Sequence, residues 1–511
     1  MNAILLPVLL FACAADDKPP APKLPLGKDT TYVNGPLDKH GYIDYEAALN
    51  AEMSKGITAE TNAKALLMLA LGPAPEGGAD MPAAYFKWLD IPAPPKQGDY
   101  LVSLYKVAHD QLGLTEEQMT ALYEFQSRAT NRVWTAKDAA PLAEWLKANE
   151  KPLAVAVEAA KRPHYFNPLV SRREEGESSN LIGTLLPSVQ KCREIAALLS
   201  CRAMLSLGDG KYDDAWRDIL ACHRLGRLMT RGATLIESLV GIAICQIASN
   251  ATLTYLDRAD LTSKQALDRL KELQALPAMS PMADKIDLGE RFMGLDALQM
   301  IRRGGNLDGE EKPATAEQRK ALEAIDWLPA MRSLNTFYTR SSTAMRLTDR
   351  AAREKELDAL EKELNELVKK NRDEAALQAL IKEAGAGKVV GQQLGNTLVA
   401  LLAPAVRKVQ QAHDRVAQVE RNLHVAFAMA AFHKDTGRYP AKLADLAPKY
   451  LAAVPDDVFG GKPLIYKPTG KGYLFYSVGV NGKDDGGRWY DDDPPGDDPG
   501  VRMPLPEPKK K

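Results

Sequence analysis

The stretch that most restricts the fold lies near the C-terminus, between Ala417 and Tyr490. Apolar residues recur in it with the spacing i, i+3, i+4, i+7, i+8, which places them on one face of a helix: Leu423, Ala426, Phe427, Ala430 and Ala431. Gly437 suits the left-handed conformation that ends many helices, and Pro440 cannot continue a helix. The pattern therefore predicts a one-sided helix that stops between these two residues.

Two β-prone runs follow this helix. Leu464–Tyr466 and Tyr473–Val478 are rich in aromatic and branched side chains, and the residues between them, 467–472, contain Pro and two Gly. A further short helix is expected over Leu443–Tyr450, before Pro455. We expect the two runs to form a β-hairpin that packs on the preceding helix.

The order of motifs in this stretch resembles the globular part of type II secretion major pseudopilins, over residues 418–493. The motifs are the helix, Tyr439-Pro440, Asp457-Val458-Phe459-Gly460-Gly461, Gly472-Tyr473, Tyr476-Ser477-Val478-Gly479 and an Asp/Gly-rich loop. In such pseudopilins an apolar N-terminal helix runs directly into the globular part. Here the preceding segment, Arg407–Arg421, is charged and rich in Gln. The resemblance therefore implies a small α+β fold, and not assembly into a pilus.

The loop after the last β-prone run is strongly acidic. Asn481–Gly487 carries two carboxylates, and more follow at Asp491–Asp493 and Asp497–Asp498. Carboxylate oxygens on a turn suit Ca²⁺, and the resemblance to pseudopilins implies calcium in the same place. The predicted ligands are Asp484, Asp485, Asp491, Asp492 and Asp493. The alternative is a solvated acidic tail, and Lys483 stands where an EF-hand loop needs a ligand.

The rest of the chain favours helices, because aromatic residues make up only 6% of it while Ala and Leu are abundant. We expect a mainly α protein, with an irregular helical bundle or solenoid-like body and a small C-terminal α+β domain. The expected regions after the N-terminal segments are 32–165, 166–300 and 301–404, all helical, the α+β domain 405–495 and a disordered tail 496–511.

One helical hairpin is expected in the middle of the chain. Gly210-Lys211-Tyr212 and Ala215-Trp216 resemble the turn between the two helices of a tetratricopeptide repeat. No second copy follows at a period of about 34 residues, so no array is predicted.

A sequence similar to a prepilin leader lies in the middle of the chain. It runs from Gly232 to Ile244 and has Glu237 at the fifth place after the glycine. A leader at this position is not expected to reach a processing enzyme. We therefore expect a buried helix of the bundle.

The N-terminus has the features of an export signal. Residues 1–15 contain an apolar core from Ile4 to Ala12, followed by small residues. Leu10-Phe11-Ala12-Cys13 resembles a bacterial lipobox, so Cys13 is a candidate for lipidation; the alternative is ordinary cleavage after Ala14 or Ala15. Residues 16–31 are rich in Pro and are expected to be a tether. The protein would then be exported to the periplasm or the outer membrane.

Motifs of known catalytic chemistry are not found in the sequence. There is no His-Glu-x-x-His and no Gly-x-Ser-x-Gly, and Gly387-Lys388 lacks the Ser or Thr of a phosphate-binding loop. Cys192, Cys201, Cys222 and Cys245 fit no zinc spacing. Cys201 and Cys222 are either partners in a disulfide or separate core thiols.

These observations favour a non-catalytic envelope protein whose helical body binds another protein. A net charge of −1 gives no electrostatic case for nucleic acid, and a membrane would be contacted only through the possible lipid anchor. One alternative is a hydrolase or other enzyme whose site is assembled from scattered residues. The other is an accessory component of a type II secretion-like system.

Overall fold

The computed structural model describes residues 20–173, 176–184, 186, 188–305, 315–371 and 385–506. The chain is mainly helical, as predicted, and it has a small three-stranded antiparallel sheet near its C-terminus. The expected export signal and Cys13 lie outside the described residues.

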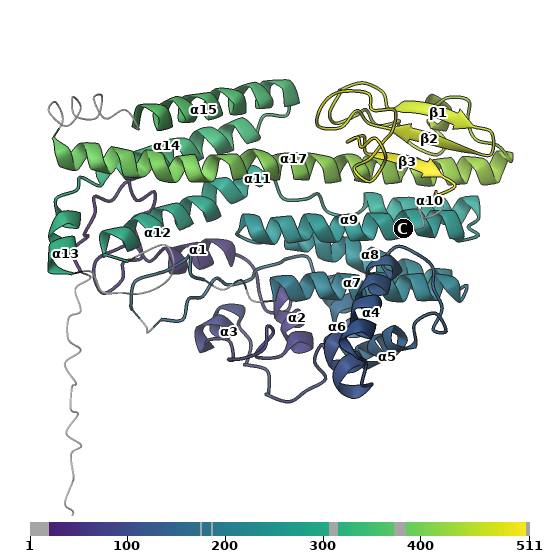
Figure 1. The fold of residues 1–511 in the computed structure, drawn as a ribbon, viewed down its shortest axis with the longest axis horizontal. Coiled ribbons are helices and arrows are strands. Elements are labelled where there is room, and N and C mark those ends of the chain that lie inside the picture. The colour runs from purple at the N-terminus through teal and green to yellow at the C-terminus, as the bar shows by residue number, and fades with distance from the viewer. Residues whose placement is uncertain are drawn as a thin grey trace, which may run out of the picture.

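A single helix, α17 (Ala386–Thr436), runs along the whole molecule (Figure 1). Its 51 residues give a length of about 76 Å at 1.5 Å per residue. Gly437 ends it in the left-handed conformation, with a φ of 70°, as the sequence predicted. The boundary expected between residues 404 and 405 falls inside this helix.

Two charged side chains in the polar segment of α17 pair with a neighbouring helix. Arg407 forms ion pairs with three carboxylates of α15 (Arg350–Asn371): Glu354, Asp358 and Glu361. Arg353 of α15 forms a buried ion pair with Asp414 of α17. Arg407 and Asp414 therefore face α15 from within this segment.

Shorter helices build the body around α17. In chain order they are α1 (Tyr45–Met53), α2 (Ala63–Leu71), α3 (Ala83–Leu89), η1 (Lys106–Gln111), α4 (Glu116–Ala129), α5 (Ala140–Ala148), α6 (Glu150–Ala159), α7 (Val189–Gly208), α8 (Tyr212–Met229), α9 (Leu235–Arg258), α10 (Ser263–Gln274), α11 (Met282–Asp284), η2 (Lys285–Glu290), α12 (Arg291–Arg302), α13 (Ala316–Glu323), α14 (Leu328–Met345) and η3 (Leu443–Leu446). Figure 1 shows α14 and α15 beside the first half of α17, and the sheet beside its second half.

Helices α7 and α8 form the expected hairpin, and α9 packs against both. Gly210 makes the turn at a φ of 74°, a backbone conformation that glycine adopts without steric cost. Ala215 and Trp216 are buried, and the ring of Trp216 meets Phe427 of α17. The hairpin is thereby fixed to the central helix.

Helix α9 is the buried helix expected over the leader-like sequence. Glu237 is fully buried, where it accepts hydrogen bonds from the backbone N–H of Thr234 at 3.2 Å and from Nδ2 of Asn167 at 2.9 Å. Burial raises the pKa of Glu237. Among the described residues, α9 is the one helix whose length and composition would suit a membrane span, but α7, α8 and α17 pack against it.

The predicted β-hairpin is confirmed by β1 (Ile465–Thr469) and β2 (Gly472–Tyr476), with Tyr466 opposite Phe475. A third strand, β3 (Gly500–Met503), pairs antiparallel with β2 and places Val501 opposite Phe475. The prediction of a disordered tail over 496–511 is therefore wrong for β3. The strand forms because β2 is buried along its full length and needs hydrogen-bond partners on both edges.

The Pro-rich segment is also more ordered than a tether. Within residues 20–31, Leu24 and Thr31 are buried, and the carbonyl of Thr30 accepts a hydrogen bond from Nδ2 of Asn335 in α14 at 2.6 Å. The hydroxyl of Tyr45 donates to the carbonyl of Thr31 at 2.8 Å. Packing on α1 and α14 overrides the preference of this composition for an extended linker.

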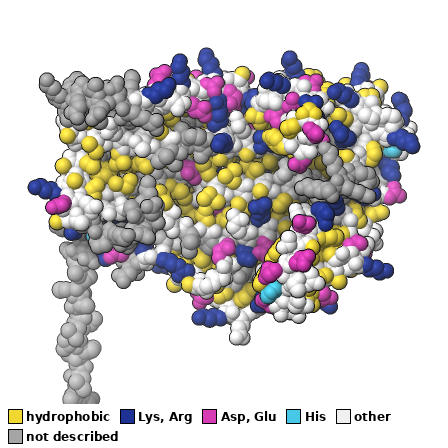
Figure 2. Space-filling view, in the orientation of Figure 1, with side chains coloured by type: hydrophobic (Ala, Val, Ile, Leu, Met, Phe, Trp, Pro, Cys, Tyr) yellow, Lys and Arg dark blue, Asp and Glu magenta, His cyan; other side chains and the backbone are white. Residues whose placement is uncertain are grey.

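Two large hydrophobic cores support the molecule. One joins the helices from α2 to α10 to the second half of α17 and to the sheet, so the sheet shares a core with the body. The other joins α1, α12, α14 and α15 to the first half of α17. Figure 2 shows hydrophobic side chains gathered on one face between α17 and α12, and around the start of α9.

Candidate functional site

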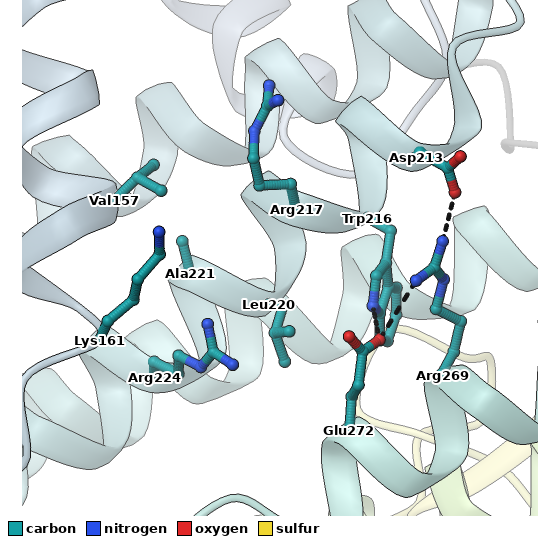
Figure 3. Close-up of a pocket in the computed structure, with 10 residues that line it drawn as sticks. All are labelled: Val157, Lys161, Asp213, Trp216, Arg217, Leu220, Ala221, Arg224, Arg269 and Glu272. Atoms are coloured by element: carbon teal, nitrogen blue, oxygen red, sulfur yellow. Dashed lines mark hydrogen bonds and ion pairs between the residues drawn. The ribbon is translucent and has the colours of Figure 1, made fainter.

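A cleft of about 450 Å³ lies on α8, between α6 and α10. Its lining combines four basic residues, two carboxylates and an apolar floor: Lys161, Arg217, Arg224, Arg269, Asp213, Glu272, Val157, Trp216, Leu220 and Ala221. Figure 3 shows Lys161 and Arg224 on one side and the group around Trp216 on the other, with Leu220 between them. We call this feature the basic cleft.

One side of the basic cleft is held by a connected set of polar contacts. Arg269 forms ion pairs with Asp213 and with Glu272, the latter at 3.3 Å between Nη1 and Oε2. Nε1 of Trp216 donates a hydrogen bond to the same Oε2 of Glu272 at 2.6 Å. Both carboxylates of the cleft are therefore already engaged by neighbouring donors.

Elsewhere in the cleft, the positive charges of Lys161, Arg217 and Arg224 are less fully neutralised by carboxylates of the chain. Nζ of Lys161 lies 2.6 Å from Oε1 of Glu158, and Nη1 of Arg217 lies 2.9 Å from Oδ1 of Asp214, in exposed pairs one helical turn apart. Such exposed pairs are weak and exchange readily with other partners. Arg224, which is partly buried, has no ion-pair or hydrogen-bond partner among the described residues.

This arrangement suits a ligand with carboxylates and some apolar surface. A guanidinium presents paired N–H donors that match a carboxylate, and Leu220 and Ala221 offer an apolar floor beside it. A cleft with a surplus of one charge also attracts oppositely charged ligands over some distance.

The sequence analysis missed the basic cleft, although α8 contains a signal for it. Arg217, Leu220, Ala221 and Arg224 stand at i, i+3, i+4 and i+7, so two cations flank an apolar pair on one helical face. Lys161 lies just after the end of α6, and only the tertiary structure brings it beside this face.

A second cluster lies in the acidic loop before β3. Carboxylate oxygens of Asp485, Asp497 and Asp498 lie within 4.8 Å of one another. Oδ1 of Asp497 and Oδ1 of Asp498 are buried without a hydrogen-bond partner in the described structure. Buried, unsatisfied carboxylate oxygens in one place fit a hard cation such as Ca²⁺.

Burial and neighbouring polar groups shift the pKa values of two carboxyl groups in this cluster. Burial, together with the charges of Asp485 and Asp484, raises the pKa of Asp498 to about 6. The pKa of Asp485 is lowered, chiefly by a hydrogen bond from Asn481. The ionised form of Asp498 is therefore unfavourable in this cluster, and a bound cation would stabilise it.

The structure brings together only part of the predicted ligand set. Asp485 belongs to the cluster, and Asp484 lies beside it with Oδ1 accepting from the hydroxyl of Tyr476 at 2.9 Å. Asp491, Asp492 and Asp493 lie outside the cluster, and Oδ2 of Asp492 caps the backbone N–H of Trp489 at 2.9 Å. Asp497 and Asp498 replace them because pairing of β3 with β2 returns the chain to this point.

The four described cysteines are free and buried. The disulfide between Cys201 and Cys222, one of the two alternatives from the sequence, is therefore not formed. Burial raises the pKa of Cys222 to about 12 and lowers that of the neighbouring His223 to about 3. Nε2 of His223 lies 2.9 Å from Oγ1 of Thr252, so this imidazole is hydrogen-bonded to a hydroxyl group.

Comparison with protein-family models, with curated proteins and with solved structures finds no match to this chain. The basic cleft and the acidic loop are therefore interpreted from their own residues.

Proposed function

We propose that this chain is a non-catalytic scaffold of the cell envelope, whose helical body holds a protein partner at the basic cleft. The observation that carries the proposal is Arg224, a partly buried cation without a partner among the described residues, next to Lys161 and an apolar floor. The partner would present an acidic segment. Export, and lipidation at Cys13, belong to this proposal as expectations from the sequence.

The contacts in the cleft favour binding over catalysis. A hydrolase would need a carboxylate, histidine or thiol free to act on a substrate. The two carboxylates here are engaged by Arg269 and Trp216, and the described residues of the lining include no histidine or cysteine. The enzyme therefore remains the weaker alternative for this cleft.

For the C-terminal α+β part we propose a structural Ca²⁺ bound by Asp485, Asp497 and Asp498. The proposal is supported by the buried Oδ1 atoms of Asp497 and Asp498, which lack hydrogen-bond partners among the described residues, and by the separation of at most 4.8 Å between the carboxylate oxygens of the cluster. Such an ion would neutralise the repulsion of the three carboxylates and tie the loop to β3. A role beside a type II secretion-like system rests on the pseudopilin resemblance alone.

The scaffold proposal can be tested with a simple acidic probe. Binding of a short oligoglutamate peptide to the full chain is measured by fluorescence anisotropy, with an oligolysine peptide of the same length as the reference. We expect oligoglutamate to bind, with an affinity that falls as salt is added. Arg224→Glu should weaken binding by at least about tenfold, because it reverses the unpaired charge.

A matched control comes from Arg438, an exposed arginine that does not line the cleft and makes no side-chain hydrogen bond or ion pair among the described residues. Arg438→Glu changes the net charge by the same amount and should leave binding unchanged. Equal loss in both variants would show that only net charge matters, and oligoglutamate that binds Arg224→Glu as well as the wild type would rule out the cleft. A pull-down from membranes with wild type and Arg224→Glu then identifies the partner.

A further inference from the structure

A second cavity, of about 330 Å³, lies where the start of η1, α4 and the first turns of α7 meet. It differs from the basic cleft because aromatic rings and amide groups dominate its lining. The residues that matter for the argument are Tyr105, Tyr123, Gln126, Trp145, Gln190 and Arg193. We call this feature the aromatic cavity.

The two tyrosines keep much of their surface in water although they border a cavity. Tyr105 is 40% exposed and Tyr123 is 44% exposed. Tyr105 is held in place by His109, whose ring is stacked on it with centroids 4.5 Å apart and planes at 19°. A ring supported on one face and open elsewhere can accept the apolar face of a ligand without being reordered.

Several hydrogen-bonding groups at the aromatic cavity are unused. Among the described residues, the hydroxyl of Tyr123, the side-chain amides of Gln126 and Gln190, and the guanidinium of Arg193 have no partner. Trp145 is different, because its Nε1 already donates to the carbonyl of Val102 at 2.7 Å and its ring is fully buried. Trp145 therefore packs beneath the cavity and leaves the exposed tyrosine rings and the free donors and acceptors to meet a ligand.

We propose that the aromatic cavity binds a neutral oligosaccharide. A pyranose ring has a face of C–H groups that packs on an aromatic ring, and a rim of hydroxyls that each donate and accept hydrogen bonds. Gln amides both donate and accept, and the Arg guanidinium donates twice in one plane, so the free groups match such a rim.

The aromatic cavity offers a ligand little charge compared with the basic cleft. Arg193 is the only charged group there without a partner among the described residues, since Glu194 is paired with Lys191 at 2.7 Å. A ligand rich in carboxylates would find more cations in the basic cleft. The inference is independent of the scaffold function proposed for that cleft.

The test is isothermal titration calorimetry of the full chain with three neutral trisaccharides: maltotriose, cellotriose and chitotriose. We expect at least one of them to bind at millimolar concentration. Tyr105→Ala and Tyr123→Ala should each weaken that binding by about tenfold, because each removes a stacking ring. Tyr123→Phe should keep the stacking and lose only the contribution of the hydroxyl.

Tyr490→Ala is the matched control, because Tyr490 is 49% exposed and lies in the C-terminal loop. It should bind the trisaccharide as the wild type does. Gln190→Ala changes an exposed amide that makes no side-chain hydrogen bond among the described residues, and it should weaken binding severalfold even where a tyrosine variant fails to fold. The proposal is overturned if none of the three trisaccharides gives heat, or if folded Tyr105→Ala and Gln190→Ala bind as tightly as the wild type.

Discussion

The indole ring of Trp216 in α8 meets the phenyl ring of Phe427 in α17 edge to face, with ring centroids 5.5 Å apart and planes at 79°. Through this contact the central hairpin and the long helix share one core. The same tryptophan donates to Glu272 at the basic cleft. The cleft is therefore built on a contact that also holds the fold together.

Replacement of Trp216 should be strongly destabilising. Trp216→Ala removes a side chain that is only 2% exposed, and we expect the free energy of unfolding to fall by about 3–5 kcal/mol. Urea unfolding followed by circular dichroism measures the change. Tyr490→Ala removes a ring that is 49% exposed and contacts Trp489 and Arg415, and it should change this free energy by no more than about 1 kcal/mol.

Replacing one partner of the ion pair between Arg353 and Asp414 should destabilise the protein more than replacing both. Both residues are buried, so Arg353→Met alone leaves an uncompensated carboxylate and should cost about 3–5 kcal/mol. The double variant with Asp414→Leu should be more stable than either single variant. By contrast, Arg340 and Glu363 form an exposed pair between α14 and α15, and Arg340→Met should cost less than about 1 kcal/mol. Thermal unfolding of the four variants gives a direct comparison.

Two glycines of the β1–β2 turn should respond differently to the same substitution. A Cβ on Gly472 would collide with the carbonyl oxygen of Met503 in β3, whereas a Cβ on Gly470 would meet nothing. Gly472→Ala should therefore cost about 1–3 kcal/mol, and Gly470→Ala should be close to neutral. If both variants unfold at the same urea concentration, the close pairing of β3 with β2 at this position is wrong.

The acidic loop should become less stable as the pH rises. The pKa of Asp498 is raised to about 6, so its ionisation in the folded state is unfavourable. Its contribution to stability is complete below the ordinary carboxyl pKa and is lost as the pH rises to about 6. Without calcium, Asp498→Asn should therefore raise the melting temperature at neutral pH and remove this pH dependence.

A Ca²⁺ ion bound as proposed should compensate the same loss, because cations bind ionised carboxylates. Calorimetry should show an affinity for Ca²⁺ that increases as the pH rises through about 6 and that disappears in Asp498→Asn. Asp491 lies outside the cluster, so Asp491→Asn should bind Ca²⁺ like the wild type. No heat from the wild type at millimolar calcium would end the metal proposal.

The core thiols should be unreactive in the native protein. Burial raises the pKa of Cys192 and Cys245 to about 11 and that of Cys222 to about 12, and it raises the pKa of Cys201 as well. The thiolate is the reactive form, so these four should react with a thiol reagent only after unfolding. Labelling followed by mass spectrometry of the peptides that contain these four residues measures their reaction. Rapid native labelling of Cys222 would contradict its burial.

Local sequence patterns correctly predicted the segments whose conformation depends on residues close together in the chain. The hairpin of β1 and β2 follows from two β-prone runs around a glycine turn, and the burial of α9 follows from its apolar composition. The end of α17 at Gly437 also needs no information from elsewhere in the chain. In each case the residues that decide the structure lie within a few positions of one another.

The tertiary structure decided what depends on distant partners. The segment from Arg407 to Arg421 is polar in the sequence, yet it continues α17, and Arg407 at its start pairs with three carboxylates of α15. Pairing with β2 turns residues 500–503 into a strand and brings Asp497 and Asp498 to Asp485. The basic cleft likewise needs three helices, because charge and hydrogen bonding act through space and only the folded chain sets those distances.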